Sequence, residues 1–94
     1  MKNTEIAAIF RDVAALLKVR KDNVFKIRAY ERAAGYIQEW PVEVEQLVKE
    51  DKLKEIPGVG EAINQKIIEL VTSGRLEYYE KLKEELTEVN NARN

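Results

Sequence analysis

The stretch Leu53-Lys54-Glu55-Ile56-Pro57-Gly58-Val59-Gly60-Glu61-Ala62-Ile63 decides the fold. Pro57 fixes one backbone torsion and ends any helix that precedes it. We expect Gly58 and Gly60 to carry the chain through backbone conformations that other residues avoid, and Val59 to point inward. Because a charged periodic segment precedes this run and an apolar periodic segment follows it, the pattern predicts two helices joined by a tight turn, a helix-hairpin-helix.

The helix that begins near Gly60 would present unpaired backbone N–H groups beside the glycine turn. Such an end suits an anion such as phosphate, and we assign Gly58, Val59 and Gly60 to phosphate binding. The alternative is a connection between helices that binds nothing. The preceding proline and the apolar residues Ile56 and Ile63 favour phosphate binding over a chance G-x-G.

The composition limits the other functions. The 94 residues form one small domain with a modest core. Neither cysteine nor histidine occurs, which excludes a disulfide framework and removes the commonest general base and metal ligand. No apolar run reaches membrane-spanning length and no signal peptide opens the chain, so we expect a cytoplasmic protein without a membrane partner.

The charges are unevenly distributed, although the net charge is only −1. Six basic residues and two acidic ones lie between Lys18 and Arg32, whereas five acidic residues and one lysine lie between Glu39 and Asp51. This asymmetry indicates a localised anion-binding face. The alternative is that both regions are solvated helix faces, and for the acidic stretch this alternative is the favoured one.

Apolar residues at three- and four-residue spacing predict helices throughout the chain. Asn3 or Thr4 is expected to cap the first helix and Asn23 the second, while Gly74 is expected to end the fourth. The expected helices cover residues 4–19, 24–39, 42–49, 60–72 and 76–88, with a short turn at 53–56. We therefore expect an all-α fold, a compact bundle of four to five short helices with one helix-hairpin-helix motif. Residues 1–88 would form one helix-hairpin-helix domain and 89–94 a flexible tail.

Two motifs together resemble the small amino-terminal domain of family X DNA polymerases. They are Phe25-Lys26-Ile27-Arg28-Ala29-Tyr30-Glu31-Arg32-Ala33-Ala34 and Ile56-Pro57-Gly58-Val59-Gly60, followed by Lys66 and Thr72-Ser73-Gly74-Arg75-Leu76. The resemblance spans about residues 4–87. It implies a four-helix core that binds single-stranded or gapped DNA in repair and grips a 5′-phosphate at the gap. The remainder of a polymerase chain is a further partner if this is one domain of a longer protein, because no polymerase active site is found in these residues.

The resemblance also implies roles for individual residues. Lys26 and Tyr30 stand at phosphate-pocket positions, Phe25 at a position that stacks on a base, and Lys66 at the nucleophile of members with deoxyribose-phosphate lyase activity. Two basic positions of the family fall on Ala62 and Tyr78, so the pocket is less positive. A monovalent cation, Na⁺ or K⁺, would be held by the main-chain carbonyls of Lys54, Ile56 and Val59.

Three functions therefore stay open. The favoured one is a DNA-binding module without sequence specificity. The second is a lyase in which Lys66, as the free amine, forms a Schiff base with an abasic sugar. The third is a protein–protein interaction module that uses the acidic third helix. Spacing alone favours a surface lysine at position 66 that pairs with Glu69, so whether the chain is an enzyme is left undecided.

Overall fold

The computed structural model describes the backbone of residues 1–93 and the side chains of residues 1–87. Helices are the only regular secondary structure in this part of the chain, and they form a compact fold, as the sequence predicts. The last helix continues through residues 89–93, where the sequence predicts a tail, and residue 94 lies outside the described residues. The elements are α1 (Asn3–Val19), α2 (Val24–Glu39), α3 (Val44–Lys49), the 3₁₀ turn η1 (Leu53–Glu55), α4 (Glu61–Ser73) and α5 (Glu77–Arg93).

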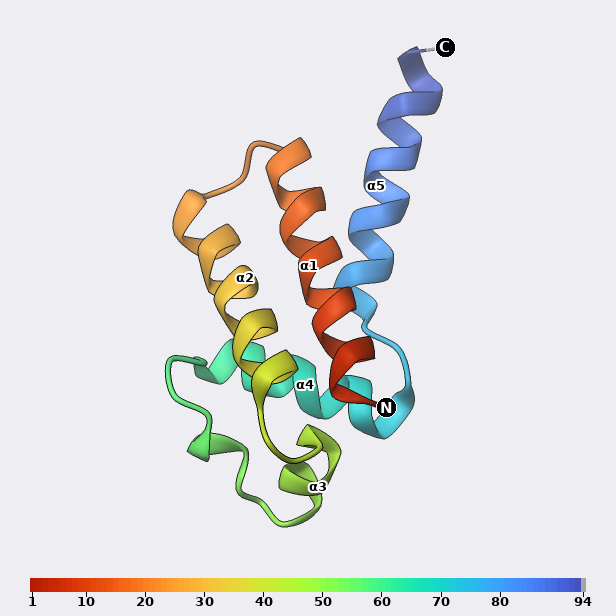
Figure 1. Ribbon diagram of the computed structural model, residues 1–94. Helices are drawn as coiled ribbons and strands as arrows, with labels where there is room; N and C mark the ends of the chain where they lie inside the picture. The colour runs from red at the N-terminus through yellow and green to blue at the C-terminus, as the bar shows by residue number, and fades with distance from the viewer. Residues whose placement is uncertain (94) are drawn as a thin grey trace.

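The helices α1 and α2 form an antiparallel pair, against which the other elements pack (Figure 1). Ala33 and Ala34 of α2 are completely buried, so small side chains allow the two helices to approach closely. The helix α5 lies along α1, whereas α4 crosses the lower part of the pair and α3 lies beyond it (Figure 1). This arrangement leaves the start of α4 beside the flank of α2.

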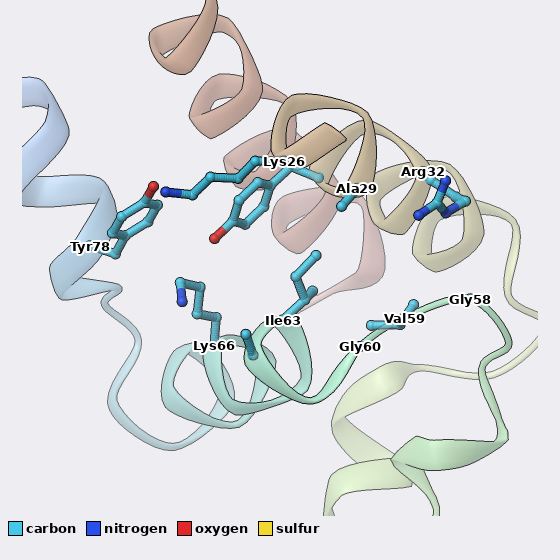
Figure 2. A pocket seen from close by; sticks show the side chains of 11 residues that line it. Lys26, Ala29, Arg32, Gly58, Val59, Gly60, Ile63, Lys66 and Tyr78 are labelled. Carbon is cyan, nitrogen blue, oxygen red and sulfur yellow. The ribbon is translucent and has the colours of Figure 1, made fainter. Parts of the chain in front are cut away.

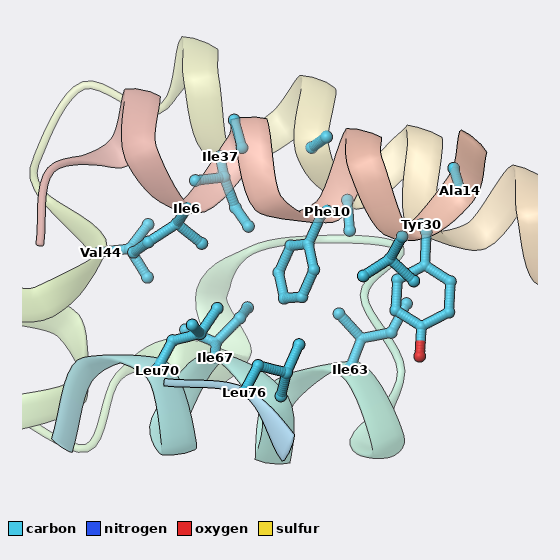
Figure 3. Packing of buried hydrophobic residues seen from close by; sticks show 14 of the residues in the cluster. Ile6, Phe10, Ala14, Tyr30, Ile37, Val44, Ile63, Ile67, Leu70 and Leu76 are labelled. Atoms are coloured by element: carbon cyan, nitrogen blue, oxygen red, sulfur yellow. The ribbon is translucent and has the colours of Figure 1, made fainter. Parts of the chain in front are cut away.

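One apolar core connects all of these helices (Figure 3). Phe10 of α1 lies above Ile67 and Leu70 of α4, and Leu76, directly before α5, belongs to the same cluster. Each of these side chains is at most 1% exposed. Full burial of such a side chain contributes about 1.5–3 kcal/mol, so this contact fixes α4 against the α1–α2 pair.

Of the two asparagines that the sequence predicts as helix caps, Asn23 caps its helix and Asn3 does not. Asn23 caps α2 as predicted, because its side-chain oxygen accepts a hydrogen bond of 2.8 Å from the N–H of Phe25. Asn3 does not cap its own helix: it lies inside the first turn of α1, after Lys2. Its side chain instead accepts from the N–H of Val44 at 2.7 Å and donates to a carbonyl of the α2–α3 connection at 2.9 Å. The prediction was wrong because the free N–H that Asn3 satisfies belongs to a helix 41 residues away.

The hairpin follows a single turn of 3₁₀ helix, and Ile56 before the proline is buried. Gly58 has a φ of +71°, so this position favours glycine, as predicted. Gly60 does not: its φ is −77° and its ψ 169°, a conformation open to any residue. Val59 is partly buried and packs against the core. Gly74 ends α4 in the left-handed conformation, with a φ of +76°.

Candidate functional site

An open cleft of about 620 Å³ lies between α2, the hairpin, the start of α4 and the start of α5 (Figure 2). It brings together all the predicted phosphate-binding residues except Phe25. None of the described residues that line it carries a carboxylate, although the chain has 17 acidic residues. The lining residues are Lys26, Ala29, Tyr30, Arg32, Gly58, Val59, Gly60, Ala62, Ile63, Lys66 and Tyr78.

The floor of the cleft at the hairpin is the uncapped N-terminus of α4. Gly60 is the N-cap residue and provides no side chain, and the first hydrogen bond of the helix runs from the N–H of Asn64 to the carbonyl of Gly60 at 2.9 Å. Within the described residues, the N–H groups of residues 60–63 therefore have no acceptor. The carboxylate of Glu61, the first residue of α4, accepts a hydrogen bond from Gln65 and lines a different cavity. These donors and the helix dipole favour an anion at this end.

Two lysines extend into the cleft from facing helices and meet at one aromatic ring (Figure 2). The Nζ atom of Lys26 in α2 lies 5.2 Å from the centroid of the Tyr78 ring, and that of Lys66 in α4 lies 4.9 Å from it. Both distances are within the range of a cation–π contact. The cleft therefore holds two ammonium groups close to the same aromatic ring.

Tyr30 forms the inner wall of the cleft. Its ring lies 5.8 Å from that of Phe10 and stacks at 6.1 Å on that of Tyr78, with 16° between the latter two planes. Burial, with a smaller contribution from Tyr78, raises the pKa of Tyr30 above its usual value of 10.0. The hydroxyl therefore stays protonated at neutral pH and remains a hydrogen-bond donor. It points out of the aliphatic cluster (Figure 3).

The predicted alternative for Lys66, a surface pair with Glu69, does not form. The carboxylate of Glu69 accepts a hydrogen bond of 2.8 Å from the N–H of Glu77, at the start of α5. This contact turns Glu69 toward a separate cavity, away from the cleft. The free N–H groups at the start of α5 attract the carboxylate, since a helix N-terminus favours negative charge.

Two residues that bring a charge or an aromatic ring to the cleft, Arg32 and Tyr78, were not predicted as site residues from the sequence. Arg32 approaches the hairpin closely: a Cβ built on Gly58 would lie 3.7 Å from its Nε. Arg28 and Arg32 lie one turn apart on α2, but only Arg32 lines the cleft. Tyr78 was noted only as the loss of a basic position. Its approach to both lysines depends on how α5 packs, which no local pattern reveals.

Phe25 lies outside the cleft, at the first turn of α2. Its side chain is 75% exposed, the highest value among the large apolar side chains that are exposed. Val24 beside it is 49% exposed. An aromatic side chain next to a lysine and open to solvent is suited to stacking on an unpaired base.

The hairpin carbonyls implied as cation ligands are free of hydrogen bonds within the described residues. Those of Lys54, Ile56 and Val59 accept no backbone or side-chain hydrogen bond, whereas that of Leu53 accepts one from Ile56. Carbonyl oxygens are suitable ligands for a hard cation. These carbonyl oxygens are therefore available as ligands, although Ile56 itself is buried.

A family model described as a helix-hairpin-helix domain matches residues 1–76. The matched region contains the hairpin, α2 and Lys66, and it ends just before α5. The comparison with curated proteins gave no match. Within residues 1–93, none of the helices has the length and apolarity needed to cross a membrane.

Proposed function

The chain belongs to the helix-hairpin-helix domain family, and we propose that it binds DNA through the phosphate backbone without reading base sequence. The observation that carries this proposal is the cleft in which free N–H groups of the hairpin and three basic side chains face one space without a carboxylate. Phosphate is the group on DNA that such donors recognise. Contacts to phosphate position a protein on DNA and carry no sequence information directly.

We further propose that the preferred ligand is a 5′-phosphate at a gap in DNA. A terminal phosphate carries close to two negative charges at neutral pH, whereas an internal phosphodiester carries one. The two ammonium groups beside Tyr78 match the terminal group better. Phe25, exposed at the edge of α2, would stack on an unpaired base of the gapped strand. With the resemblance to family X DNA polymerases, these features support a role in gap repair.

The test is a set of fluorescence anisotropy titrations with a gapped duplex, with or without a 5′-phosphate, over a range of salt concentrations. We expect the affinity to fall steeply with salt, because bound phosphates release counterions. Lys26→Ala should lower the preference for the phosphorylated duplex and reduce the salt slope by about one. Arg28→Ala removes an equal charge from the same helix outside the cleft and is the matched control.

Two results would contradict this proposal. Equal losses from Lys26→Ala and Arg28→Ala would mean that the cleft is not a dedicated phosphate site. Binding that is insensitive to salt would favour the protein interaction module instead. The acidic stretch is less available for that function, because the carboxylate of Glu43 already accepts from the N–H of Asn3 and that of Glu45 pairs with the terminal amine.

We propose that Na⁺ or K⁺ binds at the carbonyls of Lys54, Ile56 and Val59. Such an ion would stiffen the hairpin and add positive charge near the phosphate. Backbone amide shifts of residues 54–60 should change on titration with NaCl or KCl, compared with choline chloride at equal ionic strength. Identical shifts with choline would exclude this cation site.

A lyase activity is the second candidate, favoured by the position of Lys66 in the same cleft as the phosphate donors. Its amine would add to the aldehyde of an incised abasic sugar and lose water to give an imine, after which removal of a C2′ proton would expel the 3′-phosphate. Since no carboxylate lines the cleft among the described residues, water must accept that proton, and we expect weak activity. Borohydride should trap the native chain on such DNA but not Lys66→Ala. Equal trapping of both proteins would place the nucleophile elsewhere.

A further inference from the structure

Within the described residues, Tyr78 is the one aromatic residue that both cleft lysines approach. The proposed phosphate site assigns no role to it. Its position is well fixed. Leu76 before it is 1% exposed and Leu82 after it 2% exposed, so the start of α5 is anchored on both sides. Its ring also stacks on Tyr30 of α2.

We propose that Tyr78 is a positioning residue that holds the ammonium groups of Lys26 and Lys66 together and so sets the preference of the cleft for a phosphate monoester. This inference rests on the proposed DNA-binding function. Lys26 belongs to α2 and Lys66 to α4, so neither helix alone determines how close their charges lie. The ring from α5 contacts both, at 5.2 and 4.9 Å.

The physical reason is electrostatic. Two ammonium groups repel each other, and flexible lysine side chains would separate in the absence of a shared partner. The negative face of an aromatic ring attracts each of them. Without the ring the two charges would spread over the cleft, and a dianionic phosphate would lose more binding than a monoanionic phosphodiester.

The hydroxyl of Tyr78 does not contribute to this positioning. It is buried and has no hydrogen-bond partner within the described residues. Tyr78→Phe therefore keeps the ring and removes a polar group that the protein leaves unsatisfied. Tyr78→Leu and Tyr78→Met both remove the ring but retain an apolar side chain, and the second variant serves if the first is unstable. These substitutions separate the ring from the rest of the side chain.

The first measurement uses the free protein, by NMR of the lysine ε-methylene protons. We expect the aromatic ring current to displace the signals of Lys26 and Lys66 from those of exposed lysines such as Lys52. The displacement should persist in Tyr78→Phe and disappear in Tyr78→Leu. Since no DNA is present, this result tests the positioning even if the DNA-binding proposal fails. Displacement that survives removal of the ring would overturn the inference.

The second measurement is the ratio of dissociation constants for gapped duplexes with a 5′-hydroxyl and a 5′-phosphate. Loss of the two cation–π contacts should lower this ratio about 5- to 30-fold in Tyr78→Leu, while Tyr78→Phe should keep it. Tyr79→Leu is the control, because the neighbouring ring holds Lys83 at 4.2 Å outside the cleft. An unchanged ratio in Tyr78→Leu, or an equal loss in Tyr78→Phe, would refute the role of the ring while DNA binding itself stands.

Discussion

Substitution of Gly60 offers the sharpest test of the hairpin, because the structure separates its effect on DNA binding from its effect on folding. A Cβ built at Gly60 meets no atom within 4 Å, and the backbone there has a φ of −77°. Gly60→Ala therefore brings neither a clash nor backbone strain. Alanine restricts the unfolded chain, which raises the free energy of unfolding by about 0.4–1 kcal/mol. Alanine is also a poorer N-cap residue, which lowers the free energy of unfolding by about 0.5–1 kcal/mol. The free energy of unfolding should change by less than about 1 kcal/mol.

The effect on DNA should be larger. Gly60 lines the cleft and is the N-cap residue of α4, so a side chain there would stand beside the free N–H groups. Displacement of the phosphate from one of these donors removes a hydrogen bond to a charged group, worth about 1.5–3 kcal/mol. This corresponds to a loss of affinity of about 10- to 150-fold. Gly60→Leu should lose more than Gly60→Ala, since a longer side chain keeps the phosphate farther away.

The assay is a DNA titration by anisotropy, together with urea unfolding of each variant. Gly35→Ala is the matched control, because a Cβ at Gly35 also meets nothing within 4 Å but Gly35 lies outside the cleft. It should leave the affinity unchanged. Full affinity in both Gly60 variants, with their stability unchanged, would refute the idea that the hairpin N–H groups bind phosphate.

Three further predictions concern stability. Asn3→Ala should lower the free energy of unfolding by about 1–3 kcal/mol in urea titrations, because the buried N–H of Val44 loses its acceptor; a smaller loss would show that this bridge is not needed. Lys21→Gly should raise it by about 0.5–1 kcal/mol, because Lys21 has a φ of +60°, and no gain would contradict the assigned strain. Hydrogen bonds from Arg20 and from the terminal amine hold the pKa values of Asp22 and Glu45 below their usual 3.8 and 4.5. Their stabilising effect is complete above pH 4.5 and lost as the pH falls through the lower folded values, so Asp22→Asn should flatten the acid limb of a stability–pH curve.

The sequence predicts those features that depend on local physics. Apolar spacing gives the helices to within a few residues, and Pro57 and Gly74 mark where helices end. Lys26, Tyr30 and Lys66 fall into one cleft with the hairpin, as the resemblance implies. A helix face, a turn and a cap each depend on residues a few positions apart, so a linear pattern contains them.

Features that depend on packing between distant segments were missed. The side chain of Asn3 accepts a hydrogen bond from a backbone N–H of α3. The carboxylate of Glu69 accepts one from a backbone N–H of α5 and does not pair with Lys66. Tyr78 reaches the lysines only because α5 is anchored along α1. The prediction that the turn needs glycine at position 60 is wrong for another reason, because the backbone conformation there suits any residue. Absence of a side chain, rather than conformational freedom, then explains a glycine at this position.

The net charge of −1 is a poor guide to what this domain binds, because its charges act at different ranges. At physiological salt, charges in solvent are screened beyond about 8 Å, and none of the residues that line the cleft comes from the acidic stretch of residues 39–51. Several of its carboxylates are also engaged within the chain: Glu43 with a backbone N–H, Glu45 with the terminal amine and Glu50 with Lys52. The cleft, lined by Lys26, Arg32 and Lys66 without an opposing carboxylate, stays locally positive. Under the proposed function, attraction would act at contact distance, and the cleft would select a phosphate through the placement of its backbone donors and ammonium groups rather than through a long-range field.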